Sequence, residues 1–125
     1  FERGHRSGMK TGATMARSIL LPHISEGAMQ AAIKEAALRN GWLYHHAADS
    51  RRADPGLPDV LAVRGEVLLA LELKRQSGRV KPAQAEWIAA LERVRWVVPA
   101  IVRPEPRSDS ELSYDQALDL LREGR

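Results

Sequence analysis

Two short apolar runs, separated by the tetrapeptide Arg64-Gly65-Glu66-Val67, constrain the fold more than any other stretch of the chain. Each run has the length of a strand and is rich in Val and Leu. A glycine at the first central position suits the two-residue turn of a hairpin. Residues 56–74 therefore predict a β-hairpin. Because these strands have no continuous polar face, we expect them to be central strands buried on both sides.

Three charged residues stand at the outer ends of this hairpin: Asp59, Glu72 and Lys74. If Arg64 pairs with Val67, counting outward places Asp59 opposite Glu72, with Cβ atoms about 4.5–5.5 Å apart. Lys74 points to the same face because side chains alternate along a strand. Buried carboxylates need compensation, which leaves two interpretations: an ion pair of Glu72 with Lys74, or a divalent cation held between Asp59 and Glu72.

A helix is predicted before the hairpin. Ser25 is a favourable N-cap, the helical pattern runs to about Arg39, and Asn40-Gly41 ends it. Glu26 lies in the first turn, on the side of the apolar stripe that continues through Met29. Glu26 therefore either stabilises the helix dipole from the surface or faces the hairpin.

A second helix is predicted after the hairpin, from Pro82 to about Arg93. Gln84, Trp87 and Leu91 share one face of it, so we expect Trp87 in the core. A glutamine on such a face needs hydrogen-bond partners, and a nearby backbone edge is the simplest one.

The remaining elements are two strands and a last helix. We expect strands over residues 42–47 and 95–103, the second at a sheet edge or with a bulge at Pro99. Ser113 and Gln116 form a capping box for the last helix, which we expect to end at Arg122.

The resulting order, αβββαβ plus a C-terminal helix, is that of an α/β domain. The runs Gly-Leu-Pro-Asp (56–59), Glu-Leu-Lys (72–74) and Gly-Arg-Val-Lys-Pro-Ala-Gln (78–84) resemble the PD-(D/E)xK nuclease superfamily, in particular its VRR-NUC branch. Ser25-Glu26 matches the family's helical glutamate. The resemblance covers residues 25 to about 103. It implies a restriction-endonuclease-like core, with a central mixed sheet of about four strands flanked by helices.

The resemblance also implies a catalytic set, namely Glu26, Asp59, Glu72, Lys74 and Gln84. Asp59 and Glu72 would hold Mg²⁺ or Mn²⁺ together with the backbone carbonyl of Leu73, and Glu26 would support the metal directly or through water. Lys74 would orient or deprotonate the attacking water and stabilise charge in the transition state, while Gln84 holds the geometry. In one departure, Lys81 stands where Ser or Thr commonly caps the second helix.

Basic residues flank the open end of the hairpin and are the expected DNA contacts: Arg51, Arg52, Arg75, Arg79 and Lys81. Plain solvated charge is an equal alternative for the first two. The net charge of +3 is local, because residues 1–14 hold three of the 19 basic residues and one of the 16 acidic ones. No base-reading module is recognisable, so we expect recognition of nucleic-acid shape.

The 125 residues suggest one domain, over residues 15–125, preceded by a leader at 1–14 that either has no fold of its own or reaches a partner subunit or DNA. The absence of cysteine favours the cytoplasm, in a bacterial host and possibly phage-encoded.

The expected function is that of a structure-selective endodeoxyribonuclease. Stand-alone domains of this branch resemble Holliday-junction resolvases that act as homodimers, because paired active sites suit symmetric cuts. The alternatives are a flap or nicking nuclease and a catalytically silent DNA-binding subunit.

Overall fold

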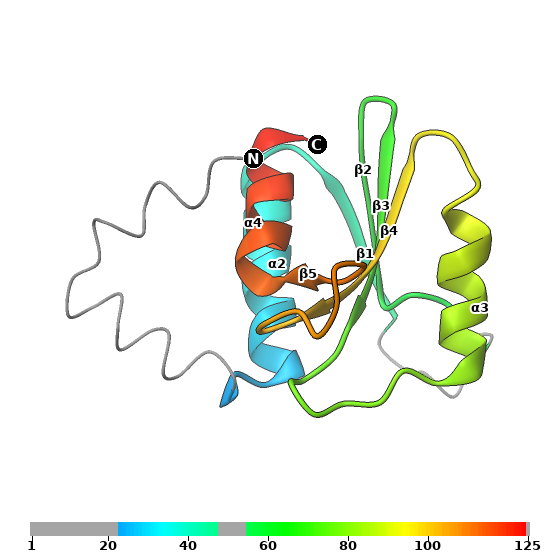
Figure 1. Ribbon diagram of the computed structural model, residues 1–125. Helices are drawn as coiled ribbons and strands as arrows, with labels where there is room; N and C mark the ends of the chain where they lie inside the picture. Colours follow the sequence, from blue (N-terminus) through cyan, green and yellow to red (C-terminus); the bar gives the residue numbers. More distant parts are fainter. Residues whose placement is uncertain (1–22, 48–54, 125) are drawn as a thin grey trace.

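The computed structural model describes residues 23–47 and 55–124 and contains three helices and five strands within them (Figure 1). In chain order these elements are α2 (Glu26–Arg39), β1 (Leu43–His46), β2 (Val60–Arg64), β3 (Val67–Leu73), α3 (Pro82–Leu91), β4 (Val97–Arg103), β5 (Leu112–Ser113) and α4 (Tyr114–Glu123). The predicted α/β class and element order are confirmed, with β5 as an addition.

All five strands form one mixed sheet in the order β1-β2-β3-β4-β5. The first three are antiparallel neighbours, whereas β3, β4 and β5 run parallel. The hairpin has the predicted register, with Arg64 paired to Val67. Gly65 has a φ of +59° while Glu66 is not among the described residues with positive φ, which corresponds to a type II′ turn.

The sheet lies between two helical layers, with α2 and α4 on one face and α3 on the other (Figure 1). The core fills the space beneath α2 and α4, where side chains from both helices meet every second residue of β2, β3 and β4. Its fully buried members include Met29, Ile33, Ala37, Val60, Leu69, Leu71, Val102, Ala117 and Leu121. Trp42 extends this core and donates from Nε1 to the carbonyl of Leu121 at 2.7 Å.

The opposite face is covered less completely, because α3 has no fully buried residue. Gln84, Trp87 and Leu91 are half-buried. The expectation that Trp87 is a core residue is therefore wrong: its ring lies at the edge of the layer, and Nε1 donates to the carbonyl of Pro55 at 3.2 Å. The helix also ends at Leu91, slightly before the predicted Arg93.

The predicted helix ends agree with the sequence signals. Ser25 accepts a hydrogen bond from the N–H of Ala28, and Asn40 caps the other end of α2. Ser113 and Gln116 form the reciprocal capping box of α4. Lys81 provides no side-chain cap to α3.

Pro99 lies within β4 and does not interrupt it. Among the described residues, β4 pairs with β5 only at Val102 and Arg103, so the outer side of β4 is open at Pro99, as expected for proline on an edge. The leader at 1–14 and the Arg51–Arg52 pair lie outside the described residues. Within the described part of the chain, no helix is both long and apolar enough to cross a bilayer.

Candidate active site

The hairpin brings Asp59, Glu72 and Lys74 together at one end of the sheet. Val60 pairs with Leu71, so Asp59, one residue earlier, stands opposite Glu72. Glu72 is 2% exposed and Lys74 is 8% exposed, and Lys74 Nζ lies 3.4 Å from Glu72 Oε2. The ion pair of the first interpretation is thus formed, but it engages only one of the two oxygens of Glu72.

Gln84 reaches the same carboxylate from α3. Its Nε2 donates to Glu72 Oε2 at 3.0 Å, and its Oε1 accepts from the backbone N–H of Lys81 at 2.9 Å. Because each end of the amide has one partner, the side-chain orientation is fixed. The backbone partner that was expected for Gln84 is therefore the N–H of Lys81, at the start of the same helix. The second partner is the Glu72 carboxylate.

The second oxygen of Glu72 is enclosed and unpaired. Among the described residues, Oε1 is the single enclosed side-chain oxygen or nitrogen without a hydrogen bond. Burial, together with the negative charge of Asp59 and a hydrogen bond to its carboxylate, raises the pKa of Glu72 from 4.5 to about 8, and Lys74 opposes this rise. Two neighbouring carboxylates with an unused enclosed oxygen fit a hard divalent cation, which would supply the missing positive charge.

Leu73 provides a backbone carbonyl beside these carboxylates. Its N–H donates to Asp59 Oδ2 at 3.1 Å, so the backbone of Leu73 is turned toward the β2 side. Extending the β2–β3 register places Pro58 opposite Leu73. Proline has no N–H, so that position cannot supply a donor to the Leu73 carbonyl, which is left as an available acceptor.

Glu26 lies at the entrance to this group. It is exposed, and its Oε2 accepts from the backbone N–H of Arg75 at 3.4 Å. Within residues 23–47 and 55–124 there is no cluster of three or more Asp, Glu, His or Cys side chains suited to a metal. Asp59 and Glu72 therefore form a pair of carboxylates. Glu26 is hydrogen-bonded to the backbone of Arg75, the residue that follows Lys74.

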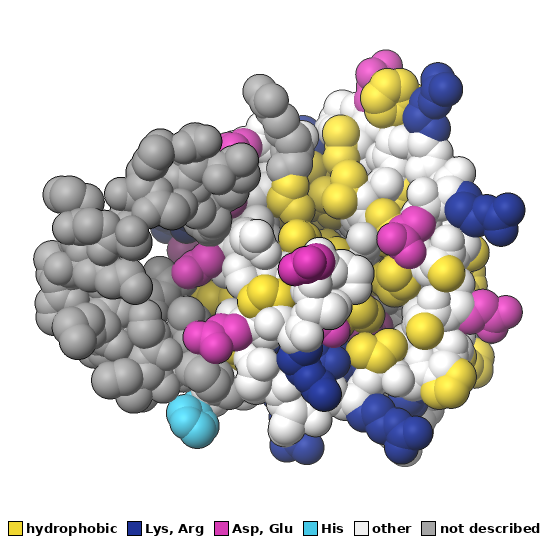
Figure 2. All heavy atoms as spheres, viewed as in Figure 1, with side chains coloured by type: hydrophobic (Ala, Val, Ile, Leu, Met, Phe, Trp, Pro, Cys, Tyr) yellow, Lys and Arg dark blue, Asp and Glu magenta, His cyan; other side chains and the backbone are white. Residues whose placement is uncertain are grey.

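The basic residues of the β3–α3 loop are exposed at this end of the sheet. Arg75, Arg79 and Lys81 are all solvent-accessible, and their side chains have no partner within the described ranges. Lys and Arg side chains gather along the lower edge of Figure 2, where Figure 1 has this loop. A positive rim thus borders the carboxylates, while Arg51 and Arg52 fall in the segment that is not described.

Two contacts near the site were not foreseen. Gln30 Nε2 donates to the hydroxyl of Tyr44 at 2.8 Å. Burial raises the pKa of Tyr44, an effect that Asp59 adds to and the Gln30 hydrogen bond opposes. Arg103 and Glu111 form a buried ion pair at 2.9 Å beside the β3–α3 loop. Both contacts depend on how helices and loops dock on the sheet, which local sequence patterns do not encode.

Two comparisons with known proteins find a similarity. The family model of the VRR-NUC domain matches residues 10–100. A solved structure described as a VRR_NUC domain is 22% identical, with a TM-score of 0.55 over 80% of this chain and 97% of that one. At this identity the structural likeness concerns the fold. No curated protein matches the sequence.

Proposed function

Because the chain belongs to the VRR-NUC domain family, we propose that it is a metal-dependent endodeoxyribonuclease that hydrolyses DNA phosphodiesters. The observation that carries this proposal is the enclosed, unpaired Oε1 of Glu72 beside the carboxylate of Asp59. An ionised carboxylate oxygen enclosed in this way costs stability unless a cation, or a proton shared with Asp59, pairs it.

Asp59, Glu72 and the Leu73 carbonyl would hold Mg²⁺ or Mn²⁺, since all three offer the oxygen ligands that these ions prefer. Glu26, at the entrance, would act through a water molecule. When bound, such an ion supplies a Lewis acid that polarises a phosphoryl oxygen.

The side chains around the carboxylates have separate tasks in this proposal. Gln84 and Lys74 hold Oε2 of Glu72, which would leave Oε1 free to bind the ion. The ammonium group of Lys74 would orient the attacking water and stabilise negative charge on the phosphorus-centred transition state. Arg75, Arg79 and Lys81 would bind the DNA backbone nearby, because exposed cations without partners attract phosphates.

We further propose branched DNA as the substrate, with a four-way junction resolved by a homodimer. Recognition of shape is expected because no base-reading module is recognisable in the sequence. A two-fold pair of sites would suit paired cuts in a symmetric junction. A flap or nicking endonuclease is the alternative enzyme, and the cytoplasmic, bacterial or phage setting stays a prediction.

The proposal is tested by incubating the protein with a four-way junction, a flap and a plain duplex, in Mg²⁺, Mn²⁺ or EDTA. We expect cleavage that requires metal, with paired symmetric nicks on the junction. Cleavage of the flap or one-strand nicking alone would select the alternative enzyme. If the protein binds all three substrates and cuts none of them, it is a catalytically silent DNA-binding subunit and not a nuclease.

A further inference from the structure

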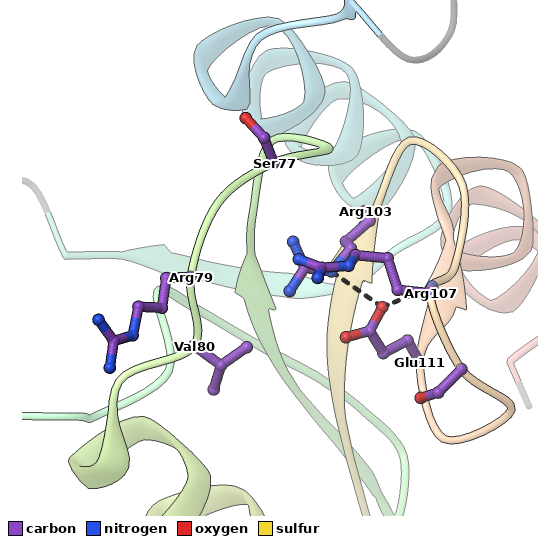
Figure 3. Close-up of a pocket in the computed structure, with 7 residues that line it drawn as sticks. Ser77, Arg79, Val80, Arg103, Arg107 and Glu111 are labelled. Carbon is purple, nitrogen blue, oxygen red and sulfur yellow. Dashed lines mark hydrogen bonds and ion pairs between the residues drawn. The ribbon is translucent and has the colours of Figure 1, made fainter.

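A second charged cluster lies beside the candidate active site, at the same end of the sheet. A pocket of about 520 Å³ opens between the β3–α3 loop and the β4–β5 loop. It is lined by Ser77, Arg79, Val80, Arg103, Arg107, Ser108 and Glu111 (Figure 3). Three arginines against one glutamate leave the pocket with a net positive charge.

Arg103 forms the floor of this pocket and joins its two walls. Its Nη1 donates to the carbonyls of Arg75, Gln76 and Gly78 at 3.1, 3.3 and 2.6 Å. Its Nε donates to Glu111 Oε1 at 2.9 Å, and the same oxygen accepts from the backbone N–H of Arg107 at 2.8 Å.

A reciprocal amide contact also ties the two loops together. Gln76 Nε2 donates to the carbonyl of Glu105 at 3.1 Å, and Gln76 Oε1 accepts from the N–H of Glu105 at 2.9 Å. With Arg103 and Gln76 bridging them, the two loops are held in place before any ligand binds, which lowers the entropic cost of binding one.

One nitrogen of this buried arginine remains available to a ligand. Arg103 is 3% exposed, yet its Nη2 has no hydrogen-bond partner within residues 23–47 and 55–124. It is also not among the enclosed unpaired atoms of that part of the chain. Nη2 is therefore reachable, and the pocket that Arg103 lines is the space from which it is reached.

Arg107 adds a second guanidinium. In Figure 3 the side chains of Arg103 and Arg107 extend from the β4 side toward the loop that carries Ser77, whereas Arg79 extends to solvent on the outer side of its loop. Arg107 is exposed, and its side chain has no partner within the described ranges. Glu111 does not cancel this charge, because Arg103 already neutralises it.

We propose that this pocket binds a phosphate group of the DNA, next to the phosphate at which the strand is cut, with Arg103 and Arg107 as charged donors. Planar guanidinium groups suit phosphate oxygens. The pocket starts just past Lys74, at the carboxyl ends of the parallel strands β3 and β4. The proposal rests on the nuclease function but concerns binding, and it assigns the β4–β5 loop to substrate recognition.

The test uses DNA binding by the Asp59→Asn protein in EDTA, so that no cutting occurs. Arg107→Ala in this background should weaken binding several-fold to about tenfold at 0.15 M salt, and reduce the slope of log Kd against log salt by about 1. Arg93→Ala is the matched control, because Arg93 is exposed just past the far end of α3.

DNA carrying a neutral methylphosphonate at one position at a time identifies the phosphate. At one internal position, the substitution should weaken binding of the Asp59→Asn protein but not of its Arg107→Ala variant. If instead removal of a 5′-terminal phosphate has this selective effect, the ligand is the strand end.

Equal affinity and salt slope for Arg107→Ala and Arg93→Ala would overturn the proposal, and so would a methylphosphonate profile unchanged by Arg107→Ala. These binding results stand whether or not the wild-type protein cuts DNA. Failure of the pocket and failure of the nuclease assignment are therefore distinguishable.

Discussion

Two buried charge clusters lie side by side at one end of the sheet, and they differ in how completely their atoms are paired. At Arg103–Glu111, one carboxylate oxygen receives two donors and one guanidinium nitrogen serves three carbonyls. At Glu72, Lys74 and Gln84 share one oxygen and the other has no partner. The first cluster anchors loops and leaves Nη2 of Arg103 at its surface, whereas the second leaves an enclosed carboxylate oxygen that the proposed cation would pair.

This difference separates stability from function. A paired buried charge contributes to the fold, and its removal leaves polar groups stranded. An under-paired carboxylate beside another carboxylate costs stability in the absence of metal, and such costs concentrate at functional sites. The two clusters should therefore respond in opposite ways to substitution.

The largest effect is expected for Asp59→Asn. Loss of one of the two carboxylates proposed to hold the metal should reduce DNA cleavage by about 10²–10⁴-fold, which corresponds to several kcal/mol of transition-state stabilisation. Stability in EDTA should not fall, since asparagine can still accept from the N–H of Leu73 and the repulsion with Glu72 is removed. Single-turnover cleavage rates and urea unfolding measure both parts. If this variant cuts DNA at the wild-type rate, Asp59 is not part of the active site.

Arg103→Met should show the opposite pattern of response, a loss of about 3–5 kcal/mol in the free energy of unfolding. Three loop carbonyls would lose the Arg103 donor, and Glu111 would keep only the N–H of Arg107. Urea unfolding of Lys74→Met provides the comparison, and its loss should be smaller because Glu72, with a pKa of about 8, can take up a proton instead. Equal losses in the two variants would contradict the distinction between the clusters.

The metal-free protein should become less stable as pH rises from about 4.5 to about 8. Over this range the folded chain retains a proton on Glu72, because its pKa is raised from 4.5 to about 8, and the unfolded chain releases it. The free energy of unfolding should therefore fall by at most about 1.4 kcal/mol per pH unit, with the full contribution present below pH 4.5. Urea unfolding in EDTA at several pH values measures this fall, and Glu72→Gln should lack it. Parallel curves for the two proteins would refute the prediction.

The smallest effect is expected at Lys81, which lies in the loop between the clusters. Lys81→Ser supplies the missing side-chain cap of α3 and should stabilise the protein by about 0.5–1 kcal/mol. The same change should weaken DNA binding, because a proposed phosphate contact is lost. Thermal unfolding and a binding titration record the two effects. A gain in stability without any loss of DNA affinity would show that Lys81 does not contribute to DNA binding.

The under-paired cluster was the more predictable of the two. Strand alternation and the Gly65 turn fix the register of a hairpin, and the register alone brings Asp59 opposite Glu72. The helix caps at Ser25 and Ser113 follow from equally local chemistry. These features depend on residues close in sequence, so the pattern of side chains determines them.

The paired cluster depends on tertiary docking. Arg103 has the pattern of an ordinary strand end, and Glu111 that of a loop residue, until the short strand β5 pairs with β4 and brings them together. The exposed position of Glu26 and the half-buried state of α3 have the same origin, since both depend on where a helix settles on the sheet. The periodicity of apolar residues predicts which side of a helix faces the sheet, but it does not predict how deeply that side is buried.

Pro58 has a consequence for anyone who wishes to move this site to another protein. A carbonyl of the main chain cannot be introduced by choosing a side chain at position 73. In the proposed site it would be usable because Pro58, opposite it, has a ring nitrogen in place of a donor. A designer who grafts the acidic residues and the lysine onto a foreign hairpin, and leaves the proline behind, would transfer the charges but lose the proposed backbone ligand.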